Sequence, residues 1–351
     1  MTPGLRAGSQ AAAGTATAMA GLPAPRHTRP MIPAPLFRLP ALAGLLALAA
    51  CTTAPTAAPA PAVPPPVMLE GTAVHHITAT GSARRYPVWV SLPPSYADQP
   101  ARRYPVLYVT DAPWSFPMLE GIRNLMGRGS GRFEEFILVG LPPEQGLSLR
   151  DSRSRDYTPT DPRQRPGFDP ADYEAPVYGQ ADAWRQVIAR QVIPLVESTY
   201  RTDPARRVYA GHSYGGLFGA HVLLTEPGLF STYILGSPSL WFDQGELFRL
   251  EQRVAAQRMA NGDTALPARV RMVIGGWERP GHQARSYGPD GKDMVGDVQR
   301  LETVLRSRGY TGLEISHRVI EGQDHGSVYP AFITDALVWA LPGSNPKYRE
   351  E

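Results

Sequence analysis

A six-residue segment, Gly211 to Gly216 (GHSYGG), constrains the fold of this chain more than any other segment. It follows a β-type run, RRVYA, and precedes an apolar helical run, LFGAHVLL. Glycines two residues either side of Ser213 suit a sharp strand-to-helix turn, where larger side chains would collide with the strand and the helix. The bare pattern is weak evidence, because 34 of the 351 residues are glycine. Its context predicts that the turn holds Ser213 at a helix N-terminus; the alternative is a glycine-rich turn whose serine only caps a helix.

Strand-like and helical runs alternate from about Val74 to the C-terminus. This alternation predicts an α/β fold with a mostly parallel central sheet and helices on both faces. The two most apolar runs, Val106–Thr110 and Phe136–Gly140, are typical of strands that are buried on both faces. The expected strands are Val74–Thr80, Tyr86–Leu92, Val106–Thr110, Phe136–Gly140, Arg207–Ala210, Thr232–Gly236, Val270–Gly275 and Glu314–Val319, and the clearest expected helices are Trp184–Tyr200, Leu301–Arg308 and Phe332–Leu341.

One segment, Pro142–Gln180, interrupts this alternation. It is long, polar and rich in Pro, Asp and Arg. Loops of this length in compact domains are usually functional or mobile. We therefore expect a long loop here that shapes a binding pocket.

A serine hydroxyl is a poor nucleophile until a base takes its proton. In strand–turn–helix sites of this kind, an acid and then a histidine follow the serine along the chain. His221 lies on the helix directly after the turn, His317 lies inside an alternating strand, and His282 precedes the last strand. His325 follows the last strand and precedes the final helix. The order of elements therefore predicts His325 as the base.

The acid that orients the imidazole should follow the strand Val270–Gly275. Glu278 lies about one turn beyond that strand and is the favoured candidate. Asp324 is adjacent to His325, and neighbouring residues rarely present their side chains to each other correctly. The other rivals, which can instead cap a helix, are Asp290, Asp293 and Asp297.

The segments that carry a family resemblance cover most of residues 84–341 and are YPVLYVTDAPWSFP, RDYTPT, QVIPLVESTYRTDPARRVYAGHSYGGLFGAHVLLTEPGLF, SPSLWFD, GGWERP and GQDHGSV. Together they resemble a bacterial esterase family of α/β-hydrolases, which includes the enterochelin-esterase-like and antigen-85-like enzymes. The closest likeness is to the siderophore-esterase branch. The resemblance implies an α/β-hydrolase fold and ester hydrolysis, with Ser213, Glu278 and His325 in the catalytic roles and no cofactor or metal. It also implies that Trp241, Arg155 and Trp114 lie at the pocket for a small-molecule ester.

Backbone N–H groups should stabilise the oxyanion in such an enzyme, and the Tyr214 N–H is the first candidate. Relatives usually have Asp-Gly-x after the third strand, and residue x can donate the second N–H. This chain has Asp111-Ala112-Pro113-Trp114 instead, and proline has no N–H. We expect a shifted loop in which Ala112, or alternatively Trp114, supplies the second donor.

Two other functions are compatible with the resemblance. The first is an acyltransferase of the antigen-85 type, in which a sugar hydroxyl replaces water. The second is a catalytically silent binding lipoprotein. The complete Ser-Glu-His set argues against the second, since no binding role requires all three residues.

The N-terminal region has the features of an export signal. Residues 39–50 are a short apolar run behind Arg38, and the tetrapeptide Leu48 to Cys51 resembles a bacterial lipobox. We expect a signal peptide over residues 1–50, with Met31 as a possible true start. A lipid on Cys51, a Pro/Ala-rich tether over 51–67 and a catalytic domain over 68–345 would follow. This predicts an exported lipoprotein on the periplasmic side of the outer membrane or elsewhere in the cell envelope.

The charge and the cysteine content of the chain limit the binding partners and the metal sites that can be expected. Residues 1–50 contain four arginines and no acidic residue, and the formal net charge of the whole chain is +3. The rest of the chain is therefore close to neutral. No basic stripe suggests nucleic acid, and no protein partner is predicted. The single cysteine, Cys51, rules out an intrachain disulfide or a cysteine-based metal site.

Overall fold

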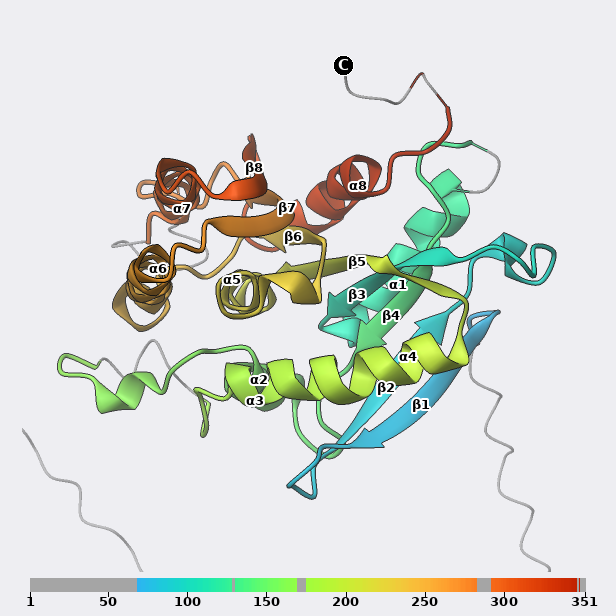
Figure 1. Ribbon diagram of the computed structural model, residues 1–351, viewed down its shortest axis with the longest axis horizontal. Helices are drawn as coiled ribbons and strands as arrows, with labels where there is room; N and C mark the ends of the chain where they lie inside the picture. Colours follow the sequence, from blue (N-terminus) through green and yellow to red (C-terminus); the bar gives the residue numbers. More distant parts are fainter. Residues whose placement is uncertain (1–67, 128–129, 169–174, 283–291, 346, 348–351) are drawn as a thin grey trace, which may run out of the picture. The chain divides into compact units, whose positions relative to one another are not determined.

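The computed structural model describes residues 68–127, 130–168, 175–282, 292–345 and 347. These residues contain an eight-stranded sheet with the order β1-β2-β4-β3-β5-β6-β7-β8 (Figure 1). The pairs β1–β2 and β2–β4 are antiparallel, and every pair from β4 to β8 is parallel. The strands are β1 (Thr72–Thr78), β2 (Arg85–Ser91), β3 (Tyr104–Thr110), β4 (Ile137–Leu141), β5 (Thr202–His212), β6 (Thr232–Gly236), β7 (Ala265–Gly275) and β8 (Thr311–Ile320).

All eight predicted strands are present, and the predicted fold class is confirmed. The central strands β3, β4 and β6 are buried along their whole length, as their apolar composition requires. The largest errors at the ends concern β5 and β7, which begin five residues before the predicted starts. The predicted signal peptide, Cys51 and the tether lie outside the described residues.

Helices cover both faces of the sheet, so the sheet separates two apolar clusters. One cluster joins one sheet face to α1 and α8, and the other joins the opposite face to α3, α4, α5, α6 and α7 (Figure 1). Both faces must be covered because a parallel sheet is apolar on each of them. These helices are α1 (Ala112–Ile122), α3 (Ala181–Val187), α4 (Ile193–Thr199), α5 (Tyr214–Thr225), α6 (Phe242–Ala260), α7 (Met294–Ser307) and α8 (Val328–Ala340).

The predicted helix over Trp184–Tyr200 is present, but it has an irregular centre. A π-helical turn, η5 (Ile188–Val192), separates α3 from α4. Pro194 lies in the first turn of α4. A proline has no N–H for the regular helical ladder, so the wider turn before it accommodates the missing hydrogen bond.

The prediction that Pro142–Gln180 is a loop throughout was wrong. The segment contains helix α2 (Leu149–Asp156) and the short 3₁₀ helix η3 (Pro162–Gln164). Ser148 caps α2 by accepting a hydrogen bond from the Asp151 N–H at 3.0 Å. The helix has hardly any apolar residues, so hydrophobic spacing could not reveal it.

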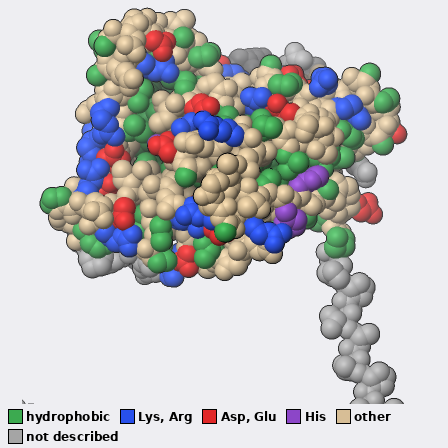
Figure 2. All heavy atoms as spheres, turned by 60° about the horizontal axis from the view of Figure 1, so that its bottom comes forward, with side chains coloured by type: hydrophobic (Ala, Val, Ile, Leu, Met, Phe, Trp, Pro, Cys, Tyr) green, Lys and Arg blue, Asp and Glu red, His purple; other side chains and the backbone are tan. Residues whose placement is uncertain are grey.

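On the face shown in Figure 2, the Lys and Arg side chains are interspersed with Asp and Glu. They form no continuous basic stripe on that face. Within the part of the chain that the structure describes, no helix combines the length and apolarity needed to span a bilayer.

Candidate active site

The predicted site residues gather at one edge of the sheet. Ser213 directly follows β5, Glu278 comes three residues after β7, and His325 comes five residues after β8. These three strands run parallel in the sheet, so their carboxyl ends meet at the same edge. Ligand sites of open α/β sheets form at this edge.

Ser213 occupies a strained turn between β5 and α5. Its φ is 59° and its ψ is −118°, which a residue with a side chain rarely adopts. Its N–H donates to the Gly236 carbonyl at 2.9 Å. A Cβ atom at Gly211 would overlap the Gly215 carbonyl, and one at Gly215 would overlap Thr110 Oγ1. The two glycines are therefore a steric requirement of the turn.

Glu278 and His325 form a direct pair. The Nδ1 of His325 lies 2.6 Å from Glu278 Oε2. The other carboxylate oxygen, Oε1, accepts hydrogen bonds from the Ser237 hydroxyl at 2.5 Å and from the Gly275 N–H at 2.9 Å. Glu278 is almost completely buried, and these donors hold its carboxylate in one orientation. No pattern in the sequence pointed to Ser237.

The other candidate acids make contacts away from the His325 imidazole. Asp293 accepts a hydrogen bond from the Gly296 N–H and so caps α7. Asp324 accepts from the N–H groups of Gly326 and Ser327, which holds the loop around His325. Asp297 lies within α7, where burial first and then Asp293 raise its pKa to about 6. Asp290 lies outside the described residues.

The rival histidines are held elsewhere. His221 Nε2 lies 3.1 Å from Asp182 Oδ1, on the side of α5 that faces α3. His317 Nδ1 lies 2.5 Å from Glu302 Oε2, and this pair joins β8 to α7. His282 is exposed. Only His325, among these four, lines a pocket together with Ser213.

The two candidates for the second oxyanion donor, Ala112 and Trp114, differ in their backbone hydrogen bonds. The Trp114 N–H donates to the Asp111 carbonyl at 3.2 Å, inside the first turn of α1, so it is already used. Ala112 is the first residue of α1 and Tyr214 is the first residue of α5. The N–H group of the first residue of a helix has no partner within that helix. The backbone therefore favours Ala112 over Trp114 as the companion of Tyr214.

A pocket of about 650 Å³ opens beside Ser213 and His325. Its apolar wall comes mainly from α1 and α8, and Trp114 belongs to it as expected. Arg150 and Arg153 of α2 contribute guanidinium groups, which pair with Asp151 and Asp111, and none of the lining residues that the structure describes is acidic. The remaining lining residues are Met118, Leu149, His212, Gly326, Tyr329 and Pro330. The pocket suits a partly apolar ligand that is neutral or negatively charged.

Arg155, which we expected at the pocket, is not among the described residues that line it, whereas Arg153 is. Successive residues of an α-helix are rotated by about 100°, and residues two apart therefore face nearly opposite sides. Arg155 is buried on the far side of α2, where it pairs with Glu144 and Asp156. Its nitrogen Nη2 also donates to the Tyr86 hydroxyl at 2.8 Å.

Trp241, another expected pocket residue, lies outside the pocket lining. Its ring packs 6.3 Å from the Tyr214 ring, and Lys292 Nζ lies 3.4 Å from its centroid. Trp241 immediately precedes α6 and belongs to the aromatic packing behind the Ser213 turn. The structure thus shows a contact of Trp241 with Tyr214, and its expected contact with substrate stays a prediction.

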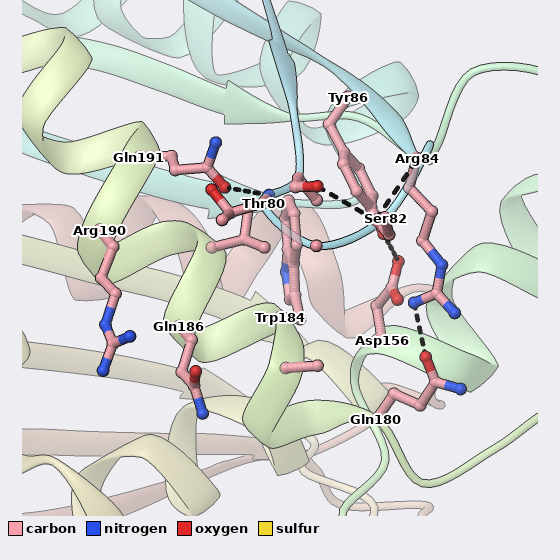
Figure 3. Close-up of a pocket in the computed structure, with 14 residues that line it drawn as sticks. Thr80, Ser82, Arg84, Tyr86, Asp156, Gln180, Trp184, Gln186, Arg190 and Gln191 are labelled. Atoms are coloured by element: carbon pink, nitrogen blue, oxygen red, sulfur yellow. Dashed lines mark hydrogen bonds between the residues drawn. The ribbon is translucent and has the colours of Figure 1, made fainter.

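A second hollow of about 420 Å³ lies between the β1–β2 loop and α3 (Figure 3). Its polar side chains largely bond to one another: Tyr86 donates to Asp156, and Arg84 donates to Gln180. Among the lining residues that the structure describes, none is a histidine or a cysteine. This hollow lacks the groups for ester chemistry. In the described parts of the chain, no cluster of His, Cys, Asp and Glu side chains could hold a metal ion.

His212 packs against the candidate base. Its ring centroid lies 4.5 Å from that of His325 and 5.9 Å from that of Phe332. Burial is the main reason why the pKa of His212 is well below its ordinary value of 6.5, and the nearby His325 and Arg153 lower it further. His212 is therefore neutral at physiological pH and supports the His325 ring without competing for charge.

This burial predicts a loss of stability in acid. Below about pH 6.5 the unfolded chain binds a proton at His212 and the folded chain does not, so the free energy of unfolding falls. The contribution is up to about 1.4 kcal/mol per pH unit, down to the folded pKa. Denaturant titrations between pH 7.5 and 5 should show a smaller slope for His212→Asn than for the wild type. Equal slopes would mean that His212 does not govern the acid sensitivity.

Solved structures of known proteins share this fold. The structure of the BES protein from Bacillus cereus matches with a TM-score of 0.65 and 23% identity, over 80% of this chain and 99% of that one. The siderophore hydrolase EstB from Aspergillus nidulans matches with a TM-score of 0.64 and 24% identity, over 79% and 98% of the two chains. The sheet order and the strand-to-helix turn at Ser213, with these likenesses, define an α/β-hydrolase.

The family follows from the sequence comparisons. The family described as Putative esterase matches residues 80–313, and the chain belongs to this family. The ferri-bacillibactin esterase BesA of Bacillus subtilis is 28% identical over 79% of this chain and 92% of its own length. The apo-salmochelin esterase of Escherichia coli O6:H1 is 30% identical over 81% and 85% of the two chains. The protein is thus an enterochelin-esterase-like enzyme that hydrolyses ester bonds.

Proposed function

We propose that this esterase cleaves ester bonds of siderophores and that Ser213, His325 and Glu278 form its catalytic triad. The observation that carries the proposal is the 2.6 Å contact between His325 Nδ1 and the buried Glu278 carboxylate, with His325 and Ser213 lining one pocket. The names of the curated relatives, which are esterases of ferri-bacillibactin and salmochelin, supply the substrate class.

The chemistry follows from these positions. Glu278 accepts a hydrogen bond from the Nδ1–H of His325, which holds the tautomer whose Nε2 is unprotonated and able to take the hydroxyl proton of Ser213. Ser213 Oγ attacks the ester carbonyl, and the N–H groups of Tyr214 and Ala112 stabilise the oxyanion. His325 then protonates the leaving alcohol. Water releases the acyl group from Ser213 by the same steps in reverse order.

The lining of the pocket favours an acyl group that has both apolar and polar parts. Trp114, Met118 and Tyr329 give one apolar side, while Arg150 and Arg153 provide guanidinium N–H groups. A siderophore ester with aromatic and acidic groups could use both sides. We therefore expect specificity constants to be higher for such esters than for small aliphatic esters.

The substrate class is tested by a hydrolysis screen of the purified protein. The panel contains enterobactin, salmochelin, bacillibactin and triacetylfusarinine C, with and without iron, beside aryl acetates and acetylated sugars. We expect at least one siderophore to be cleaved with a specificity constant well above those of the aryl acetates. Cleavage confined to aryl or sugar esters would contradict the siderophore assignment and leave the esterase chemistry intact.

We also propose that the enzyme is held at a membrane by a lipid on Cys51, the only cysteine of the chain. The apolar run before Cys51 and the Pro/Ala-rich segment after it support this proposal. Cys51→Ser is expected to abolish incorporation of an alkyne fatty acid and to leave the protein unprocessed or soluble. Label that persists in the variant rules out Cys51 as the anchor.

A further inference from the structure

The guanidinium of Arg153 joins the ends of two neighbouring strands. Its Nε and Nη2 lie 3.0 and 3.3 Å from the two carboxylate oxygens of Asp111, the first residue after β3. Nη2 also donates to the carbonyl oxygen of His212, the last residue of β5, at 3.3 Å. Its carbon Cζ lies 5.2 Å from the centroid of the Tyr214 ring. One side chain of α2 thus contacts both turns that lead into α1 and α5.

These two turns carry the proposed oxyanion donors. Ala112 follows Asp111 directly, and Tyr214 comes two residues after His212. Asp111 and Ser213, the residues immediately before the two donors, have φ values of 55° and 59°. Because few residues with side chains adopt such angles, contacts from outside the turns must maintain them. Arg153 supplies such a contact to each turn.

The orientation of Asp111 strengthens this reading. Asp111 is the N-cap residue of α1, and an aspartate there usually accepts a hydrogen bond from an N–H of the first helical turn. Here its side chain makes no such bond and its carboxylate pairs with Arg153 instead. The carboxylate is completely buried in this pair. Arg153 thereby neutralises a buried negative charge that lies next to the N–H groups that the oxyanion needs.

We propose that Arg153 is a positioning residue for the oxyanion hole. It holds the Ala112 and Tyr214 N–H groups in the positions that the oxyanion needs, and it neutralises the Asp111 carboxylate. The proposal rests on the proposed function, because it takes Ser213 as the nucleophile. The kinetic parameters distinguish a positioning residue from one that only binds substrate. Loss of a binding residue changes KM, whereas loss of a positioning residue weakens stabilisation of the transition state and therefore lowers kcat.

The test uses Arg153→Gln in the full chain and a small neutral aryl ester. A lost oxyanion donor costs about 10²–10³-fold in kcat, so we expect a fall of at least about 100-fold with KM changed less than about threefold. The rate at which a neutral phosphonate labels Ser213 should fall in parallel. The double variant Arg153→Gln/Asp111→Asn should recover part of kcat, because the unpaired carboxylate is gone.

Arg308→Gln is the matched control. Arg308 binds the buried Glu251 through Nε and Nη2, both at 2.8 Å, which is the same two-point geometry at a distant place. It should lower thermal stability and leave kcat unchanged. Should Arg153→Gln fail to fold, Arg153→Lys keeps the charge without the two-point contact, and kcat is expected to fall about tenfold.

Three results would overturn the proposal: kcat of Arg153→Gln within about threefold of the wild type, a loss confined to KM, or an equal loss of kcat in Arg308→Gln. If the phosphonate fails to label Ser213 in the wild type, the proposed nucleophile is at fault instead. The two failures are therefore distinguishable.

Discussion

Replacing Ser213 by alanine is expected to lower kcat for ester hydrolysis by about 10⁴- to 10⁶-fold, because no covalent intermediate can form. The fold should persist, since the backbone hydrogen bonds of Ser213 to Gly236 and Ser239 remain and only the contact between the hydroxyls of Ser213 and Ser239 is lost. Turnover of an aryl ester, measured beside circular dichroism of the same preparation, checks both expectations. A kcat within tenfold of the wild type would show that the nucleophile lies elsewhere.

Ser239 provides the control for this experiment. Its hydroxyl lies 3.3 Å from that of Ser213, so it is a neighbouring alternative nucleophile. A fluorophosphonate probe should label Ser213 in the wild type and in Ser239→Ala, and should label nothing in Ser213→Ala. Labelling at Ser239 by mass spectrometry would reverse the assignment.

The second large effect is expected for Glu278→Gln, with kcat reduced about 10³- to 10⁴-fold by comparison with other catalytic triads. The donors around Glu278 explain why. Ser237 and the Gly275 N–H both donate to Oε1, so the amide oxygen of glutamine must take that position. The amide NH₂ then faces His325 Nδ1 and can only donate to it. His325 is forced to carry its proton on Nε2, where it cannot accept the proton of Ser213.

Asp293→Asn and Asp297→Asn are the controls for the acid. Asp293 caps α7, and Asp297 lies within that helix, so both changes should alter stability more than kcat. The pH dependence of kcat/KM, measured for all three variants, separates an effect on the base from an effect on folding. If either aspartate variant loses more activity than Glu278→Gln, the acid has been misassigned.

Much of the fold could be predicted because it depends on local pattern. Strands buried on both faces are continuously apolar, and each of the eight was found within a few residues of its true ends. The order of elements also selected His325 and Glu278, since chain order after the serine turn determines which strand end each residue occupies. The pairing between them is long-range, and only the structure could measure it.

The remainder depends on charged and polar groups that carry no periodic signal. Helix α2 was missed because ion pairs and a cap stabilise it, although Ser148 followed three residues later by Asp151 is a recognisable capping signature. Without that helix, Arg153 and Arg155 could not be assigned to opposite faces. Ser237 could not be foreseen either, because its contact with Glu278 joins two different strand ends.

The positive φ angles at this edge of the sheet have a consequence for the evolution of thermostability. Asp111, Ser213 and Ser237 each directly follow a strand, the three strands are neighbours, and all three residues have φ between 38° and 59°. Such conformations cost about 1–3 kcal/mol each, and glycine adopts them without this cost. Glycine at any of these positions would therefore raise the stability of the fold, so selection for heat resistance alone would favour it. Each such substitution would also remove a side chain that the site uses. Laboratory evolution for thermostability should hold these three positions constant and seek its gains elsewhere in the fold.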